Sequence, residues 1–209
     1  MKKGIITILS GFSGAGKGTV VKKLVSEYEN YALSISATTR KPRTGEMDGR
    51  EYFFKTVDEF KKMIEGDELI EHACYVGNYY GTPKDYVEKQ LSEGKDVILE
   101  IDLQGAMKIK EKNPDVVLVF ETPPSAAELK KRLVGRGTED METINARLKT
   151  AVGESAYMDK YDYLLINDDL DSCVKELHEL IQSEHYSIKR NINKINNIRE
   201  DIKIFSEGE

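Results

Sequence analysis

The sequence has few of the residues on which secreted and membrane-bound proteins depend. Its 209 residues include two cysteines and no tryptophan. No apolar run approaches the roughly 18 residues of a membrane span. Cys74 and Cys173 stand far apart, outside any CxxC or histidine-rich pattern, so neither a disulfide framework nor a zinc site is expected. Because no export signal is visible either, we expect a cytoplasmic protein without a membrane partner.

An excess of basic residues is also lacking. The chain has 31 Lys and Arg against 37 Asp and Glu, for a net charge of −6. A polyanionic partner usually requires a basic face, so a nucleic-acid partner is not expected. Any phosphate site must therefore be local, within what the length predicts to be a single catalytic unit.

Short apolar, β-branched runs alternate along the chain with segments of helical spacing. The runs predict buried strands at 5–9, 32–36, 97–101, 116–120 and 163–166. Helical spacing of apolar residues follows at 20–25, 129–133 and 144–148. This alternation predicts an α/β fold, with a parallel sheet flanked by helices on both faces in a three-layer core.

A glycine-rich segment follows the first predicted strand and opens a helix expected from about Lys17 towards Tyr28. Its residues are Gly11, Phe12, Ser13, Gly14, Ala15, Gly16, Lys17, Gly18 and Thr19. In this context the pattern GxxxxGK predicts a P-loop, whose backbone N–H groups and helix N-terminus surround a polyphosphate. Lys17 supplies positive charge to the terminal phosphates. We therefore predict that this segment binds ATP.

The residue after the P-loop lysine departs from the usual pattern. Gly18 stands where a hydroxyl would ligate magnesium, and Thr19 comes one position later. Glu100 and Asp102 end the predicted strand 97–101, which places them beside the P-loop in a parallel sheet. We predict Mg²⁺ as cofactor, with Thr19, Glu100 and Asp102 holding it through water. Helix capping or solvation is the alternative role for the two carboxylates.

A second group of motifs follows the second predicted strand. In chain order it consists of Ser34-Ile-Ser-Ala-Thr-Thr-Arg-Lys-Pro-Arg43, Gly45-Glu46, Gly49, Tyr52, Glu71 and Gly77-Asn-Tyr-Tyr-Gly-Thr82. Arg40 and Arg43 stand three apart around Pro42, so a rigid bend can aim both guanidinium groups at one phosphate dianion. Tyr52 and Tyr80 can donate hydroxyl hydrogens to it. A solvated basic loop is the alternative.

Taken together, these motifs resemble the guanylate kinase family over roughly residues 4 to 183, in one unbroken order. The resemblance implies transfer of the terminal phosphoryl group of ATP to GMP, and to dGMP, in purine nucleotide metabolism. Glu71 is implied to read guanine, which presents two N–H donors on its Watson–Crick edge. The remaining GMP-binding residues that the resemblance implies are Ser36, Arg40, Arg43, Tyr52, Tyr80, Gly81, Thr82 and Asp102.

The charged stretch 128–158 has Gly135 and Gly137 on either side of Arg136, which is typical of a helical lid with a flexible elbow. The resemblance implies that closure of the lid excludes water from the phosphates. It gives the catalytic cations as Lys17, Arg40, Arg43, Arg132, Arg136 and Arg147. It also places Asn167 near the adenine of ATP. Solvated positions on an exposed helix are the alternative for each lid arginine.

These features predict one guanylate kinase-like domain at 1–183 and a helical tail at 184–209. Within the domain we expect a core at 1–37, 85–127 and 159–183, a GMP-binding subdomain at 38–84 and a lid at 128–158. Isoleucines at 188, 192, 195 and 202 form a narrow helical stripe in the tail, interrupted by Arg199. The tail is expected to lie back on the body. Self-association is the alternative, and the choice between monomer and homo-oligomer stays open.

Other classes share parts of this pattern. Guanylate-kinase-like modules of scaffolding proteins bind phosphorylated ligands without catalysis and characteristically lack a working P-loop, whereas Lys17 and its glycines are present here. A P-loop GTPase would need an NKxD-type segment, which this sequence lacks. Adenylate kinase shares Gly-Lys-Gly-Thr but not the string TTRKPRTGE. The acceptor-site residues therefore favour a GMP kinase.

Overall fold

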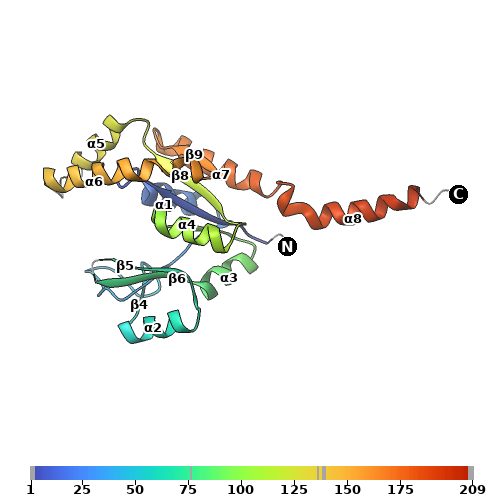
Figure 1. Ribbon diagram of the computed structural model, residues 1–209, viewed down its shortest axis with the longest axis horizontal. Helices are drawn as coiled ribbons and strands as arrows, with labels where there is room; N and C mark the ends of the chain where they lie inside the picture. Colours follow the sequence, from blue (N-terminus) through green and yellow to red (C-terminus); the bar gives the residue numbers. More distant parts are fainter. Residues whose placement is uncertain (1–2, 76, 136, 138–139, 207–209) are drawn as a thin grey trace.

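The computed structural model describes residues 3–75, 77–135, 137 and 140–206, and it contains two β-sheets (Figure 1). The larger sheet consists, in spatial order, of β2 (Tyr31–Leu33), β7 (Asp96–Glu100), β1 (Ile6–Gly11), β8 (Val117–Thr122) and β9 (Tyr163–Ile166). All its strand pairs are parallel. This confirms the predicted parallel sheet.

Helices cover both faces of this sheet. The helices on one face are α1 (Lys17–Glu27) and α7 (Leu170–Glu184), and those on the other are α3 (Lys84–Ser92) and α4 (Leu103–Lys112). Ile8 and Leu9 are neighbours in β1, and both are apolar because their side chains point to opposite faces of the sheet, each of which is covered by helices. Leu9 packs in the core cluster that includes Val21 and Leu177, whereas Ile8 packs in the cluster that includes Val87 and Ile109. The predicted three-layer α/β fold is therefore confirmed.

The smaller sheet lies beside the core, with β5 against α4 (Figure 1). It consists, in spatial order, of β4 (Phe53–Phe54), β3 (Ala37–Thr38), β6 (Asn78–Pro83) and β5 (Leu69–Tyr75). Helix α2 (Val57–Glu65) begins at a capping box formed by Thr56 and Glu59, and it buries Phe60 against this sheet. Residues 37–83 thus form a small unit around the second sheet. That this unit is a GMP-binding subdomain with boundaries at 38 and 84 stays a prediction.

Two helices pack over the P-loop. They are α5 (Ala126–Gly135) and α6 (Met141–Ser155), and the 3-10 turn Met158–Lys160 follows them. Leu129 and Leu133 of α5 meet Ile144 and Ala151 of α6, and Phe12 of the P-loop packs against this cluster. The charged stretch 128–158 therefore has an apolar inner side that rests on the phosphate-binding loop.

The C-terminal helix α8 (Ile192–Ile202) extends away from the body, and none of its described residues is buried (Figure 1). The expectation that the tail lies back on the body is wrong for α8, whereas the residues before it do contact the core: His185 forms a hydrogen bond with Asp96, and Arg190 donates to the carbonyl of Asp115. The 3-10 turn Lys189–Asn191 redirects the chain after α7, and the amide of Asn191 holds it by donating to the carbonyls of His185 and Ser187. A further 3-10 turn, Lys203–Phe205, ends the described tail.

The two cysteines are unpaired, as predicted, with Cys74 exposed and Cys173 buried. Among the described residues, no helix combines the length and apolar character that crossing a bilayer requires.

Candidate functional site

The P-loop joins β1 to α1 and depends on glycine at two positions where the backbone has a positive φ. Gly14 has φ +96° and Gly16 has φ +120°, a region that L side chains rarely adopt. A Cβ on Gly14 would lie 2.8 Å from Leu133 of α5, and one on Gly16 would lie 2.4 Å from Asn167. Gly14 and Gly16 therefore allow the loop to turn, and they allow Leu133 and Asn167 to lie close to its backbone.

Lys17 begins α1 and holds its ammonium against the loop. Its Nζ donates to the carbonyl oxygens of Gly11 at 2.8 Å and Phe12 at 3.1 Å. Glu100, the last residue of β7, lies near the same helix end, because a Cβ on Gly18 would be 3.4 Å from its carboxylate. Partial burial of its carboxylate raises the pKa of Glu100, whereas the charge of Lys17 opposes this rise. Gly18 thus leaves room for an acidic group beside the P-loop.

The predicted metal residues do not form a cage. No three His, Cys, Asp or Glu side chains gather within the described residues in a way that could hold a metal. Thr19 is exposed, and Asp102 accepts a hydrogen bond from the Gly105 N–H at 2.7 Å, which caps α4. Capping therefore accounts for one oxygen of Asp102. These residues fit a cation carried by the nucleotide phosphates and its water shell better than a direct protein site.

Two side chains support the phosphate loop from behind. Glu121 lies opposite Gly11 in the sheet and is fully buried. Its Oε1 accepts a hydrogen bond from Asn167 Nδ2 at 3.0 Å, and the same nitrogen donates to the carbonyl of Ala15 at 3.1 Å. Glu121 Oε2 has no hydrogen-bond partner among the described residues. Asn167 is therefore tied to the P-loop itself.

Two of the three predicted lid arginines reach the P-loop. Arg132 donates from Nη1 to the carbonyl of Ala15 at 2.9 Å and from Nε to Glu128 at 3.1 Å. Arg147 donates to the hydroxyl of Ser13 at 2.6 Å. Arg136 lies outside the described residues. The contacts of α5 and α6 thus place two guanidinium groups beside the predicted position of the phosphates.

Arg40 and its neighbours form a second cationic site in the loop between β3 and β4. The Arg40 Nη2 donates to both carboxylate oxygens of Glu46, at 2.9 and 3.0 Å, and its guanidinium lies 5.2 Å from the centre of the Tyr52 ring. The Tyr52 and Tyr80 rings meet edge to face at 6.2 Å. Arg43 is exposed, and its backbone N–H donates to Glu46 at 2.7 Å. Glu46 thus orients Arg40 and the turn that carries Arg43.

The side chain of Glu71 on β5 points towards the first turn of α4. Its Oε1 accepts a hydrogen bond from the hydroxyl of Thr82 at 2.9 Å. A Cβ on Gly105 would lie 3.7 Å from Glu71 Oε2 and 3.4 Å from Asp102 Oδ1, so the two carboxylates border one spot. Burial raises the pKa of Glu71, and the charge of Asp102 adds to this rise.

The last two predicted acceptor residues, Ser36 and Gly81, lie where β3 pairs with β6. A Cβ on Gly81 would lie 2.8 Å from the backbone of Glu71, so glycine permits the close approach of β6 and β5. Ser36 is half-buried directly before β3, and its carbonyl accepts from Phe53. The structure therefore gathers Ser36, Glu71, Gly81 and Thr82 around the smaller sheet.

The sequence motifs do not predict a role for three acidic or phenolic groups near the P-loop, which are Glu121, described above, and Glu154 and Tyr161. Glu154 of α6 and Tyr161 each have a buried oxygen without a partner among the described residues. Burial raises the pKa of Glu154, and the positive charge of Lys17 opposes this rise. Of the three, only Glu121 could have been found from the sequence. It is a carboxylate directly after the apolar run 116–120, at the end of a predicted strand that neighbours the P-loop strand in the sheet.

Glu121 leads to a prediction on pH and stability. Burial raises the pKa of Glu121 from the usual 4.5 to about 7. The folded protein therefore holds this proton more tightly than the unfolded chain, and the free energy of unfolding falls as the pH rises from about 4.5 to 7. This difference corresponds to ~3 kcal/mol. Glu121→Gln cannot ionise and still offers an oxygen to Asn167, so we expect a more stable protein at pH 8 and little change near pH 4.5.

Urea unfolding at both pH values measures this effect. Glu88→Gln, on the exposed side of α3, is the matched control and should not stabilise the protein at either pH. A gain from Glu121→Gln that is equal at both pH values would contradict the titration of Glu121.

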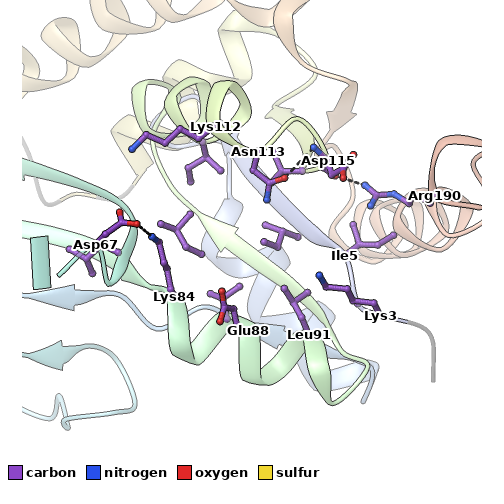
Figure 2. Close-up of a pocket in the computed structure, with 17 residues that line it drawn as sticks. Lys3, Ile5, Asp67, Lys84, Glu88, Leu91, Lys112, Asn113, Asp115 and Arg190 are labelled. Carbon is purple, nitrogen blue, oxygen red and sulfur yellow. Dashed lines mark hydrogen bonds and ion pairs between the residues drawn. The ribbon is translucent and has the colours of Figure 1, made fainter. Parts of the chain in front are cut away.

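A cavity of about 460 Å³ lies at the opposite end of the strands, between α3, α4 and the chain before α8 (Figure 2). Lys84 forms an ion pair with Asp67 at 2.5 Å, and Arg190 donates to the carbonyl of Asp115 at 2.5 Å. Ile5 and other apolar side chains line the cavity. Ligands of parallel α/β sheets bind at the carboxyl ends of the strands, so this cavity is separate from the P-loop site.

The fold, the P-loop lysine and the helices that carry arginines to the loop define the class of P-loop kinases. The guanylate kinase family model matches residues 3–184. The chain belongs to the guanylate kinase family.

Individual relatives agree with this assignment. A guanylate kinase of Lactococcus lactis is 47% identical over 203 residues, which cover 97% of this chain and 99% of that protein. One from Caldanaerobacter subterraneus subsp. tengcongensis is 50% identical over 200 residues, with 96% and 97% covered. The crystal structure of guanylate kinase from Anaplasma phagocytophilum has a TM-score of 0.72 and 34% sequence identity, and it covers 91% of this chain and 90% of that one. The resemblance seen in the sequence motifs is confirmed.

Proposed function

We propose that this chain transfers the terminal phosphoryl group of ATP to GMP or dGMP, in the purine nucleotide metabolism of the cytoplasm. The products are ADP and the corresponding guanosine diphosphate. The observation that carries the proposal is an intact P-loop, with Lys17 over the loop carbonyls, in the same chain as the Glu71–Thr82 pair. A non-catalytic binding module would have no use for the P-loop lysine.

The proposed GMP phosphate site consists of Arg40, Arg43, Tyr52 and Tyr80. Glu46 already holds Arg40 against the Tyr52 ring, which fixes the guanidinium and reduces the entropy lost on binding. Arg43 is exposed and can turn onto an incoming dianion. The phosphate and Glu46 would then share the positive charge of the two arginines.

Glu71 is proposed to accept the N1–H and N2–H groups of guanine. The Thr82 hydroxyl holds the carboxylate in place, and Ser36, Gly81 and Asp102 border the same space. Adenine presents an acceptor at N1, so it would leave Glu71 unpaired in a half-buried site. None of these proposed contacts uses the ribose 2′-hydroxyl, which supports dGMP as a second acceptor.

Charge and position, rather than proton abstraction, carry the proposed reaction. The attacking phosphate oxygen of GMP is already ionised near neutral pH, so no general base is needed. Lys17, Arg132 and Arg147 surround the P-loop and would stabilise the charge of the transferring group, together with Arg136. Mg²⁺ bound to ATP would neutralise phosphate charge, with Thr19, Glu100 and Asp102 ordering its water shell. Lid closure by α5 and α6 would exclude water as a competing acceptor.

A coupled assay of ADP release with GMP, dGMP, AMP, CMP and UMP tests this function. We expect phosphorylation of GMP and dGMP, and for AMP a kcat/KM lower by about 10⁴-fold, because adenine leaves buried polar groups unpaired. Phosphorylation of AMP faster than GMP would contradict the assignment of the acceptor site. ADP release that depends on none of the five acceptors would contradict the kinase activity itself.

A further inference from the structure

Glu121 is a fully buried carboxyl group directly behind the P-loop, and the proposed reaction gives it no role. It lies in β8, opposite Gly11 in the sheet. A Cβ on Gly16 would lie 3.3 Å from Glu121 Oε1, so the carboxyl group approaches the loop closely. Burial of an ionisable group costs free energy, and a carboxyl group buried beside a phosphate-binding loop therefore requires a physical reason.

Glu121 determines how the amide of Asn167 is oriented. Asn167 Nδ2 donates to Glu121 Oε1 at 3.0 Å and to the carbonyl of Ala15 at 3.1 Å. Only the nitrogen end of an amide can donate to two acceptors, so these two bonds fix which end of the amide faces the loop. Glu121 thereby holds the N–H groups of Asn167 against the P-loop.

The carbonyl of Ala15 in turn sets the direction of one N–H group of the P-loop. Because this carbonyl accepts from Asn167, it points to the side of the loop on which Glu121 lies. In a trans peptide the C=O and N–H bonds point in opposite directions. The N–H of Gly16 therefore points away from Glu121, and it is available to a phosphate bound by the loop.

The two oxygens of Glu121 differ in their surroundings. Oε1 accepts from Asn167, whereas Oε2 is buried and has no hydrogen-bond partner among the described residues. In the ionised form, negative charge on Oε2 would therefore have no donor beside it. A proton on Oε2 removes this charge and leaves Oε1 as the acceptor for Asn167. Both the burial and the hydrogen bond are thus compatible with a neutral carboxyl group.

The charges that face Glu121 come from several elements. Lys17 of α1 and Arg132 of α5 favour its ionised form and lower its pKa, whereas Glu100 of β7 raises it. Cys173 of α7 stays a neutral thiol near pH 7, because burial raises its pKa to about 12. ATP phosphates in the loop would neutralise the two cations. ATP binding thus removes the positive charge that supports ionised Glu121.

We propose that Glu121 is a positioning residue of the ATP site, which takes up a proton when ATP binds. The proton passes from the buffer to the carboxylate of Glu121, and the neutral group continues to hold Asn167 through Oε1. Burial raises the pKa of Glu121 to about 7 in the free protein, so ATP affinity should fall as the pH rises above this value. This inference rests on the proposed use of ATP.

Isothermal titration calorimetry of the full chain with ATP and Mg²⁺, without GMP, counts the proton. The binding enthalpy is measured at about pH 7.5 in buffers of different ionisation enthalpy, and its slope gives the protons taken up. Glu121→Gln binds the same ligand but cannot ionise, so its slope should be smaller by a few tenths of a proton. Glu88→Gln, on the exposed side of α3, is the matched control and should keep the wild-type slope. Equal slopes for the wild type and Glu121→Gln would overturn the proposal.

Glu121→Leu tests the positioning role, because leucine occupies the space but accepts nothing from Asn167. We expect the Kd for ATP to rise about tenfold, since a buried N–H group loses its acceptor, while the Kd for GMP stays unchanged. Glu121→Gln retains an acceptor oxygen and should keep ATP affinity close to that of the wild type near pH 7. A wild-type Kd for ATP in Glu121→Leu would overturn the positioning role, as would an equal loss of ATP and GMP affinity. Should leucine prevent folding, calorimetry of Glu121→Gln still decides the proposal. A wild-type chain that binds no ATP would overturn the proposed function as well.

Discussion

Replacing Lys17 by alanine is expected to lower kcat for GMP phosphorylation by about 100- to 1,000-fold. The ammonium of Lys17 lies over the P-loop, held by the carbonyls of Gly11 and Phe12, at the start of α1. From this position the ammonium can stabilise the negative charge that develops on the transferring phosphoryl group. The loss should therefore appear in kcat at saturating ATP and GMP, and not only in the KM for ATP.

The matched control is Lys23→Ala, on the same helix. Lys23 forms ion pairs with Glu27 and Asp171 on the outer face of α1, and surface pairs of this kind contribute little to stability. This variant should keep wild-type kcat. Circular dichroism and thermal unfolding should show that both variants fold. A Lys17→Ala protein with near-normal kcat would contradict the role of the P-loop lysine.

The sequence predicts the core of this protein well because its signals are local. The P-loop stands between a buried strand and a helix within 27 residues, and the structure places β1 at Ile6–Gly11 and α1 at Lys17–Glu27. The second strand is less well predicted. The apolar run predicts one strand at 32–36, but β2 ends at Leu33 and the chain then crosses to Ala37 in the smaller sheet. An apolar run does not reveal that its halves belong to different sheets.

Contacts between distant segments account for what the sequence does not predict. Glu121 meets Asn167 across 46 positions, and Arg147 meets Ser13 across 134. In each pair, nothing in the sequence around one residue indicates which distant residue it contacts. The direction of α8 has the same cause, since it depends on the hydrogen bonds of Asn191 to the end of α7 and not on the apolar stripe.

Replacing Glu71 by glutamine is expected to lower kcat/KM for GMP by about 100-fold and to narrow the preference for GMP over AMP. The carboxylate offers two acceptor oxygens, whereas the amide offers one acceptor and one donor group. Guanine would then meet an N–H donor with another donor, inside a half-buried site where an unpaired polar group costs about 1–3 kcal/mol. Adenine, with an acceptor at N1 and a donor at N6, matches the amide better.

Steady-state kinetics with GMP and AMP, for wild-type and Glu71→Gln proteins, measure both changes. Glu68→Gln is the matched control, because Glu68 is an exposed carboxylate three residues away, before β5. It should leave the ratio of the two kcat/KM values unchanged. A Glu71→Gln protein that retains the wild-type ratio would contradict guanine recognition by this residue.

The pH profile separates recognition by Glu71 from a merely structural role. Burial raises the pKa of Glu71, so its carboxylate is lost at a higher pH than that of an exposed glutamate as the solution is acidified. Guanine needs the ionised form, and kcat/KM for GMP should therefore fall on acidification in the wild type. Glu71→Gln has no such ionisation and should lack this part of the profile. If the variant kept the same acid limb, another group would have to be responsible for it.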